Sequence, residues 1–459
     1  MSIRQQILSI AEKRILILDG AVGSLIQALN LGKICNDNLC RTNPQKIINI
    51  HNAYLEAGAD IIETCSFNST SVSLADYGLE HEAYEISTAS ARIARECADK
   101  YSTPDKPRFV AGSIGPTAKG ASLYPDINNP GKRSIIWDEL ENAYYDNARG
   151  LLDGGADILI VETIFDTLNA KAAFFAISRL MEEQQIDIPV IVSVTISGEG
   201  GRLLSGQNLE AFVISVKHIN PLAIGLNCSS GAEKLFPFVR EISNIINDKK
   251  IPCLVIAYPN NGFPNSQGIY EETPEVMSNK IDAYFKEKLV NIIGGCCGTT
   301  PAHIETIAKK AADYSPREIS HPGETQGIWL SGLEAHYIEN IDTLPASILK
   351  IDAKDINEFR QALIDGEFEN AADIARDIID SGADILPIEI DDEKILNRFL
   401  DFALLDPYVS KVPFFLKSSN IKVLETGLKR LQGKALAGPI DNDNAKIIKR
   451  YGAYPVIGV

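Results

Sequence analysis

The sequence lacks any apolar run of the roughly 18 or more residues that a membrane-spanning helix requires. Its first residues carry charges at Arg4, Glu12, Lys13 and Arg14 and contain neither the apolar core nor the cleavage site of a secretory signal. We therefore expect a cytoplasmic protein that does not bind membranes.

Positive charge is also scarce, because 44 Lys and Arg stand against 61 Asp and Glu, which gives a formal net charge of −17. Nucleic-acid binding depends mainly on Lys and Arg contacts to phosphates, so we expect no nucleic-acid partner. The hydrophobic share of 45% and the charged share of 23% are typical of a globular protein. The 459 residues suffice for two or three domains, or for one large barrel with an extension.

The chain has eight cysteines, at positions 35, 40, 65, 97, 228, 253, 296 and 297. Without an export signal they are poor evidence for disulfides, because the cytosol keeps thiols reduced. Clustered cysteines are therefore candidates for metal binding or catalysis.

The first two thirds of the sequence alternate between short β-branched runs and longer segments with helical apolar spacing, which is typical of repeated βα units around a parallel sheet. Eight such strands in about 300 residues favour a (β/α)8 TIM barrel over an open doubly wound sheet, which is the alternative. The predicted strands are Ile15–Gly20, Ala59–Thr64, Phe109–Gly115, Ala156–Thr163, Ile191–Ile196, Leu222–Cys228, Cys253–Asn260 and Val290–Cys297.

A Gly-Ala-Asp phrase followed by apolar residues occurs three times, beginning at Gly58, Gly155 and Gly382. Its glycine is suited to end a helix in a left-handed conformation, and the apolar residues that follow begin a buried strand. The third copy lies far beyond the eighth predicted strand. The C-terminal part is therefore expected to consist of βα units as well.

We divide the chain into a barrel at residues 1–314, a linker at 315–325 that carries two prolines, and a truncated half-barrel at 326–459. The predicted strands of the last part are Ser347–Asp352, Ala383–Ile390, Val412–Lys417, Ala435–Ile440 and Tyr454–Val459. Its predicted helices are Asp355–Leu363, Asn370–Ser381, Lys394–Leu404, Ile421–Leu431 and Asn444–Tyr451. So few strands cannot close an eight-stranded barrel, so this part is either truncated or completed by another chain.

Three cysteines fall at the carboxyl ends of predicted strands, where a parallel barrel carries its chemistry: Cys228 at the sixth, and Cys296 and Cys297 at the eighth. Successive strand residues point to opposite faces, so the last two can share a ligand only where the strand turns into Gly298. Three thiolates leave the fourth position of a tetrahedral Zn2+ open, as in catalytic zinc sites. Ordinary packing is the alternative for any single buried cysteine and is what we expect of Cys35, Cys40, Cys97 and Cys253, which have no such position.

An open Zn(Cys)3 site suits a substrate thiol, because zinc coordination deprotonates a thiol near neutral pH and the thiolate is a nucleophile. The predicted chemistry is alkyl transfer to sulfur.

The chain resembles the homocysteine S-methyltransferase family, and within it the N-terminal part of the cobalamin-dependent methionine synthases. The motifs that carry the resemblance are DGAVGS at 19–24, IETCSFNST at 62–70, GSIGPT at 112–117, VETIFD at 161–166, GLNCSSG at 225–231, YPNNGFPN at 258–265 and GGCCGTTPAHI at 294–304. The resemblance implies that Cys228, Cys296 and Cys297 bind zinc and act in catalysis. It further implies that Asp19, Glu162 and Glu63, with the backbone at Gly20, hold the amino and carboxylate groups of L-homocysteine.

The sequence departs from the family at Cys65-Ser66, where Asn-Thr is usual. Cys65 is a fourth cysteine near the predicted zinc site, and we interpret it as a packing substitution.

The C-terminal part resembles the folate-binding barrel of the methionine synthases in WLSGLEAH (329–336) and in SSNIKVLETGLKRLQGKALAG (418–438). The positions that contact the pterin in the family are replaced here, at 350–354, 387–389, 417–419 and 438–439. A pterin edge rich in donors needs an acceptor, whereas Lys417 has only donors. The chain also lacks the Asp-x-His-x-x-Gly run that binds cobalamin.

These observations predict zinc-dependent methyl transfer to L-homocysteine to give L-methionine. The expected donor is methylcobalamin supplied in trans by a separate corrinoid or folate-domain protein. Two alternatives remain: a methyltransferase that uses S-methylmethionine or a betaine as donor, and a non-catalytic assembly subunit.

Overall fold

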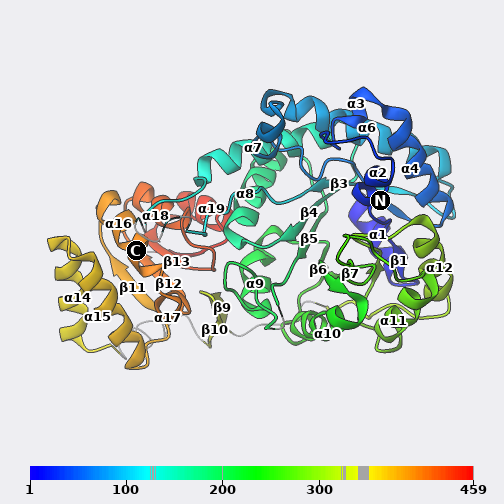
Figure 1. Cartoon of the computed structure of the whole chain (residues 1–459). Helices are drawn as coiled ribbons and strands as arrows, with labels where there is room; N and C mark the ends of the chain where they lie inside the picture. The colour runs from blue at the N-terminus through cyan, green and yellow to red at the C-terminus, as the bar shows by residue number, and fades with distance from the viewer. Residues whose placement is uncertain are drawn as a thin grey trace.

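A computed structural model describes all residues of the chain except 125, 127, 128, 130, 199, 322, 324–326, 340–350, 458 and 459. Its larger part is a ring of eight parallel strands surrounded by helices (Figure 1). The strands run in the order β1-β8-β7-β6-β5-β4-β3-β2, and a parallel bridge between Leu18 and Ile61 joins the two ends of this order. The predicted (β/α)8 barrel is confirmed. The strands are β1 Leu16–Ile17, β2 Ile61–Glu63, β3 Phe109–Ile114, β4 Ile158–Ile164, β5 Val190–Val194, β6 Ala223–Gly231, β7 Leu254–Asn260 and β8 Ile292–Ile293.

The helices of the barrel bury the outer face of the sheet, while alternate strand residues fill its interior. Inside, Leu16, Ile61 and Ile256 form one apolar cluster with Ile7 of the first helix. The described helices are α1 Ile3–Ala11, α2 Val22–Ala28, α3 Leu39–Thr42, α4 Pro44–Glu56, α5 Ser71–Leu74, α6 Ala83–Tyr101, α7 Trp137–Asp153, α8 Thr167–Gln184, α9 Leu209–Val216, α10 Ala232–Asp248, α11 Pro274–Lys286 and α12 Pro301–Ala311, with short 3-10 turns at 75–77, 80–82 and 217–219. None of the helices formed by described residues is long and apolar enough to span a bilayer.

The repeated Gly-Ala-Asp phrase forms the predicted turn in all three copies. Gly58, Gly155 and Gly382 adopt φ values of 108°, 101° and 100°, which a side chain would strain. In the first two copies the aspartate reaches the preceding strand, because Asp60 accepts a hydrogen bond from the Ile17 amide and Asp157 accepts one from the Val110 amide. Each turn therefore joins a helix end to a neighbouring strand.

The C-terminal part is a smaller α/β unit beside the barrel (Figure 1). Its parallel sheet has the order β11-β12-β13-β14, with strands Leu386–Glu389, Phe414–Lys417, Leu436–Ile440 and Tyr454–Ile457. Its helices are α14 Ala353–Asp365, α15 Phe368–Asp380, α16 Glu393–Ala403, α17 Pro407–Ser410, α18 Ile421–Leu428 and α19 Asn442–Arg450. Most of the strand predicted at Ser347–Asp352 lies outside the described residues. An antiparallel hairpin of β9 Ile328–Ser331 and β10 Ala335–Ile338, which the sequence did not predict, packs on the sheet.

Polar contacts to buried groups fix the C-terminal part to the barrel. Lys171 of α8 is fully buried, and its ammonium donates hydrogen bonds to the carbonyl oxygens of Leu431 and Gly433 at 2.8 and 2.9 Å. Within the predicted linker, Arg317 is 3% exposed and donates to Ser243 and Asn247 of α10. The segment that leaves the barrel is thus anchored to it.

Candidate functional site

Cys228 lies at an irregular end of β6 and lines a cavity of the barrel. Cys228 and Ser229 have φ values of 56° and 54°, and the pairing of β6 with β7 shifts register between Cys228 and Gly231. The Ser229 hydroxyl accepts a hydrogen bond from the Ile196 amide at 2.8 Å, which holds this turn against the segment after β5. Consecutive left-handed residues cost conformational energy, and such strain is concentrated at functional sites.

Cys296 and Cys297 follow the end of β8, in the turn that the sequence predicted. The Cys296 amide donates to the Pro259 carbonyl at 2.8 Å, and the Asn261 amide donates to the Cys297 carbonyl at 2.9 Å. Gly298 closes the turn with φ 78°, and a Cβ there would collide with the Tyr270 ring. Because the strand has already ended, both thiols face the same region.

The three thiols form one cluster, in which all sulfur atoms lie within 4.8 Å of one another and Cys228 Sγ lies 3.7 Å from Cys297 Sγ. Zn–S bonds of about 2.3 Å in tetrahedral geometry place two sulfurs about 3.8 Å apart, so the spacing fits zinc. Among the described residues, no other group of three His, Cys, Asp or Glu side chains meets these limits.

The thiols of the cluster also differ in pKa. Hydrogen bonds from Cys228 and Cys296 hold the pKa of Cys297 well below its usual value, and hydrogen bonds with Cys228 and Cys297 raise the pKa of Cys296. A thiolate, which is the form that coordinates metal, is therefore favoured within the cluster.

The cluster lies at a cavity of about 400 Å³ on the carboxyl-terminal side of the barrel. Its lining comes from the carboxyl ends of β2, β3, β4, β6 and β7 and from the segments that follow β1, β2 and β8, and it includes Gly20, Glu63, Glu162 and all three cysteines. A Cβ at Gly20 would lie within 2.9 Å of the Tyr54 and Thr299 side chains, so only glycine lets the backbone pack this closely against them. No Lys or Arg is among the described residues that line the cavity.

Buried carboxyl groups give the cavity its chemical character. Glu162 is 4% exposed and accepts hydrogen bonds from the hydroxyls of Ser113 and Tyr258. Burial raises the pKa of Glu162 to about 7, and burial together with the charge of Glu162 raises the pKa of Glu63 well above its usual range. Buried acids without a cation are costly, so the arrangement favours a cationic ligand.

Asp19 lies behind Glu63 and does not line the cavity. It is 1% exposed, and its Oδ2 accepts a hydrogen bond from the Glu63 amide at 3.1 Å. Its Oδ1 has no hydrogen-bond partner among the described residues, and burial raises the pKa of its carboxyl well above the usual range. Asp19 therefore contacts the backbone of β2 at Glu63 and not the Glu63 carboxylate.

Sequence reasoning missed Asp37, which lies between α2 and α3 and lines the same cavity. Asp37 is 4% exposed and accepts a hydrogen bond from the Asn68 amide at 2.7 Å, and burial raises its pKa to about 7. It follows no strand and belongs to none of the quoted motifs, so only its proximity to the IETCSFNST segment could have identified it.

Cys65 lines the cavity as well but contacts a different set of groups from the three clustered thiols. Its thiol donates to the Asn36 carbonyl, and the Cys40 thiol donates to the Cys65 carbonyl, each at 3.7 Å. Cys65 is not part of the cluster that could hold a metal ion. These contacts agree with its interpretation as a packing residue.

The strand ends of the C-terminal sheet carry a different arrangement. Glu389 at the end of β11 and Lys417 at the end of β12 form an ion pair of 2.7 Å, and Arg360 lies 3.4 Å from Glu389. Lys417 lowers the pKa of Glu389. The acid at this position is therefore already neutralised by protein cations.

Comparison with known proteins places the barrel in one family. The family model for homocysteine S-methyltransferase matches residues 16–311. Two structures of the homocysteine methyltransferase MmuM from Escherichia coli are similar to this chain. The metallated form is 23% identical with a TM-score of 0.51, covering 66% of this chain and 98% of that chain. The oxidized form is 22% identical with a TM-score of 0.53, covering 67% of this chain and 99% of that chain. At these identities the structures support the fold.

Proposed function

Because the chain belongs to the homocysteine S-methyltransferase family, we propose that it transfers a methyl group to the sulfur of L-homocysteine and so forms L-methionine. The observation that carries this proposal is the cavity in which three clustered thiols face buried carboxyl groups with no cation among the described lining residues. A substrate with a thiol at one end and an ammonium at the other matches both sets of groups.

Cys228, Cys296 and Cys297 would hold Zn2+, which when bound lowers the pKa of a coordinated thiol so that it is deprotonated at neutral pH. Their sulfur spacing and the thiolate favoured at Cys297 support this assignment. Three protein ligands leave one position for the substrate sulfur.

Glu162 and Glu63 would hold the ammonium group of homocysteine, and Asp19 would support Glu63 through its amide. The Ser113 and Tyr258 hydroxyls orient the Glu162 carboxylate toward the cavity. A charge-assisted hydrogen bond to a buried carboxylate fixes the amino acid and thereby the direction of its side chain. The substrate thiolate then attacks the methyl carbon, a carbon–sulfur bond forms, and the bond between that carbon and the donor breaks.

The proposed donor is methylcobalamin, carried by a separate corrinoid or folate-domain protein. The Glu389–Lys417 pair supports an external source of the methyl group, because it occupies strand ends that the folate-binding family uses for the pterin. A methyl group on a tertiary amine also has a poor leaving group, so direct transfer from methylfolate is unfavourable.

A small cationic donor, such as S-methylmethionine or a betaine, is a second candidate. Asp37 and the absence of Lys and Arg among the described lining residues favour it, since a sulfonium or ammonium would be attracted to this cavity.

Turnover with each donor in turn tests the proposal. We expect the purified chain to methylate homocysteine from free methylcobalamin or S-methylmethionine, but not from methylfolate alone. Turnover with methylfolate and no corrinoid protein would contradict the donor assignment. A chain that binds no zinc and is inactive with all three donors would instead support the non-catalytic assembly subunit.

A further inference from the structure

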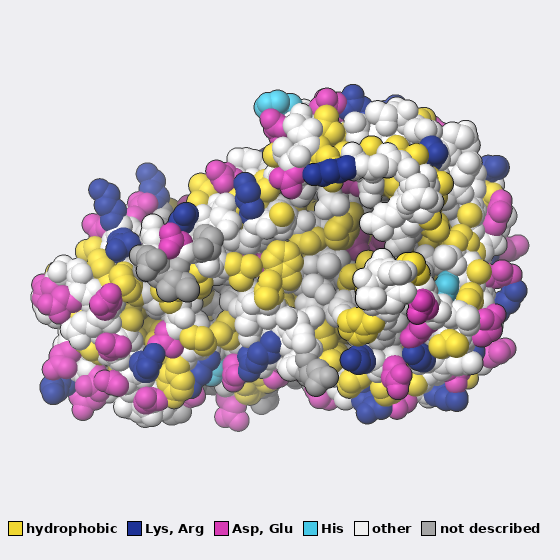
Figure 2. Space-filling view, viewed as in Figure 1, with side chains coloured by type: hydrophobic (Ala, Val, Ile, Leu, Met, Phe, Trp, Pro, Cys, Tyr) yellow, Lys and Arg dark blue, Asp and Glu magenta, His cyan; other side chains and the backbone are white. Residues whose placement is uncertain are grey.

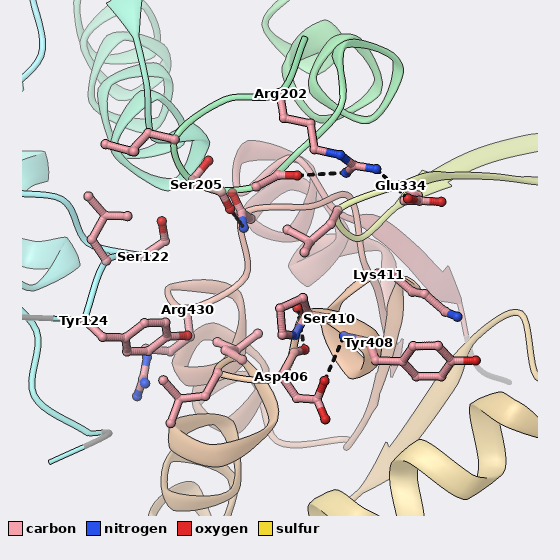
Figure 3. A pocket seen from close by; sticks show the side chains of 18 of the residues that line it. Ser122, Tyr124, Arg202, Ser205, Glu334, Asp406, Tyr408, Ser410, Lys411 and Arg430 are labelled. Atoms are coloured by element: carbon pink, nitrogen blue, oxygen red, sulfur yellow. Dashed lines mark hydrogen bonds and ion pairs between the residues drawn. The ribbon is translucent and has the colours of Figure 1, made fainter. Parts of the chain in front are cut away.

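A second cavity, larger than the one at the cysteines, lies between the barrel and the C-terminal part. It measures about 870 Å³, which is within the size range of small-molecule sites, and such sites occur preferentially at domain interfaces. The loops after β3 and β5 form its barrel side, and the segments before β12 and β13 with the β9–β10 turn form the other side (Figure 3). None of the three cysteines of the candidate metal site lines it.

Apolar side chains from both parts are exposed in this cleft. Leu204 of the barrel is 56% exposed, and Leu405 of the C-terminal part is 39% exposed. Leu123, Leu333 and Leu404 add to the same lining. Figure 2 shows hydrophobic side chains gathered in the hollow between the two parts. Contiguous exposed apolar surface of this kind marks a binding site.

The charge of the cleft is opposite to that of the whole protein. Four cationic side chains line it, Arg133, Arg202, Lys411 and Arg430, against two acids, Glu334 and Asp406, whereas the chain as a whole is acidic. A local positive excess on an acidic protein attracts an anionic ligand.

Both acids are already engaged. Glu334 pairs with Arg202 at 2.8 Å, and Asp406 pairs with Arg376, which does not line the cleft. Asp406 also caps α17 through the Tyr408 amide. Arg202 and Arg430 are paired as well, Arg430 with Asp401 outside the lining, so the cation that the cleft offers to a ligand is Lys411.

Lys411 lines the cleft on the side of the C-terminal part. Its ammonium lies 3.3 Å from the centre of the Tyr408 ring and forms no ion pair with a described carboxylate. Figure 3 shows Tyr408 and Lys411 together on one side of the cleft and Tyr124 with Arg430 on the opposite side. Arg430 is paired with Asp401 at 2.7 Å.

We propose that this interdomain cleft binds a small organic carboxylate, whose apolar body lies against Leu204 and Leu405 and whose carboxylate is held by Lys411. The ligand contacts both parts of the chain, so its binding stabilises their docked arrangement. This site is separate from the proposed methyl-transfer site and does not depend on zinc.

Calorimetric titration of the full chain with octanoate and with 1-octanol tests the proposal. We expect saturable binding of octanoate at one site per chain and binding of 1-octanol that is about tenfold or more weaker, because the alcohol lacks the charge that Lys411 recognises. Equal binding of the two probes, or no saturable binding of octanoate, would overturn it.

Two variants locate the binding. Leu204→Glu should weaken octanoate binding about tenfold or more, through lost apolar contact and charge repulsion, and Lys411→Gln should also weaken it about tenfold or more, because it removes the cation that the carboxylate contacts. Ile364→Glu on α14 is the matched control, because Ile364 is 53% exposed and does not line the cleft, and it should bind like the unmodified chain. Unchanged binding in Leu204→Glu would overturn the location. Zinc content and methyl transfer should be unaffected in both cleft variants, so failure of this inference is distinguishable from failure of the proposed function.

Discussion

The barrel and the C-terminal sheet are built from the same βα unit, with the same glycine turn, yet their strand ends differ in chemistry. At the barrel strand ends, Glu63 and Glu162 line a cavity that contains no Lys or Arg among its described residues. At the strand ends of the C-terminal sheet, Glu389 is 48% exposed and paired with Lys417. One set of acids still requires a cation, and the other already has one.

In a fold made of repeated units, this difference distinguishes strand ends that can bind a cationic ligand from strand ends that cannot. A parallel strand end brings side chains together in either sheet, but a carboxylate that is already paired with a lysine gains little from a ligand. Buried carboxylates without a protein cation can instead form charge-assisted hydrogen bonds with a cationic group of a substrate. Among the two sets of strand ends, the unpaired acids of the barrel therefore favour a cationic ligand, and the paired acid of the C-terminal sheet does not.

The largest effect is expected from the thiol cluster. Cys228→Ser, Cys296→Ser and Cys297→Ser should each lose most bound zinc and all detectable methyl transfer, because a serine hydroxyl stays protonated where a thiolate is required. Metal analysis of the purified variants measures this. Cys253→Ser is the matched control, since Cys253 is 1% exposed and lies outside the cluster. Full zinc content in all three variants would exclude the cluster as the zinc site.

Next in size is the loss of one buried carboxylate. Glu162→Gln should raise the KM for homocysteine roughly tenfold to a hundredfold, since a charge-assisted hydrogen bond contributes about 1.5–3 kcal/mol, while zinc content is retained. Steady-state kinetics at saturating donor measures the change. Glu389→Gln is the same substitution at a strand end of the other sheet and should leave KM unchanged. If Glu162→Gln lost zinc and kept its KM, Glu162 would support the metal site instead of the substrate.

The junction between the two parts should respond through Lys171. Lys171→Met removes both hydrogen bonds to the C-terminal part and should lower the free energy of unfolding by about 2 kcal/mol, because the Leu431 and Gly433 carbonyls lose their partner. Denaturant unfolding measures this, with the exposed Lys354→Met as control.

The same lysine predicts a pH dependence. Burial lowers the pKa of Lys171 from its ordinary value of 10.5 to about 7. Between these values the unfolded chain binds more protons than the folded one, so the free energy of unfolding should rise with pH across this window. The rise should be smaller in Lys171→Met. An identical slope in both proteins would show that Lys171 is charged in the folded state.

The smallest effect is expected at the paired strand ends. Lys417→Gln should change the free energy of unfolding by no more than about 0.5 kcal/mol, because Lys417 and Glu389 are 35% and 48% exposed and water screens their attraction. Thermal or denaturant unfolding measures it. A large loss would mean that this ion pair holds the C-terminal sheet together, which would remove the contrast with the barrel.

The sequence by itself predicted the eight strand positions of the barrel and the turns at Gly58, Gly155 and Gly382, because hydrophobic periodicity and helix-ending glycines act locally. It also predicted that Cys296 and Cys297 need a turn at Gly298 in order to face one ion. Strand order in a barrel is sequential, so strand-end motifs far apart in the chain were expected to meet.

Only the tertiary structure determined which residues meet when they come from segments outside the quoted motifs. It placed Asp37 at the cavity, Asp19 against the Glu63 amide and the Cys40 thiol against the Cys65 carbonyl, and it formed the β9–β10 hairpin on the C-terminal sheet. It also buried Lys171 against the carbonyls of Leu431 and Gly433 and formed the interdomain cleft beside them. These features depend on contacts between segments that are far apart in the sequence. Such contacts form where side chains pack closely and where buried polar groups find hydrogen-bond partners, and a local sequence pattern does not show which segments will meet in this way.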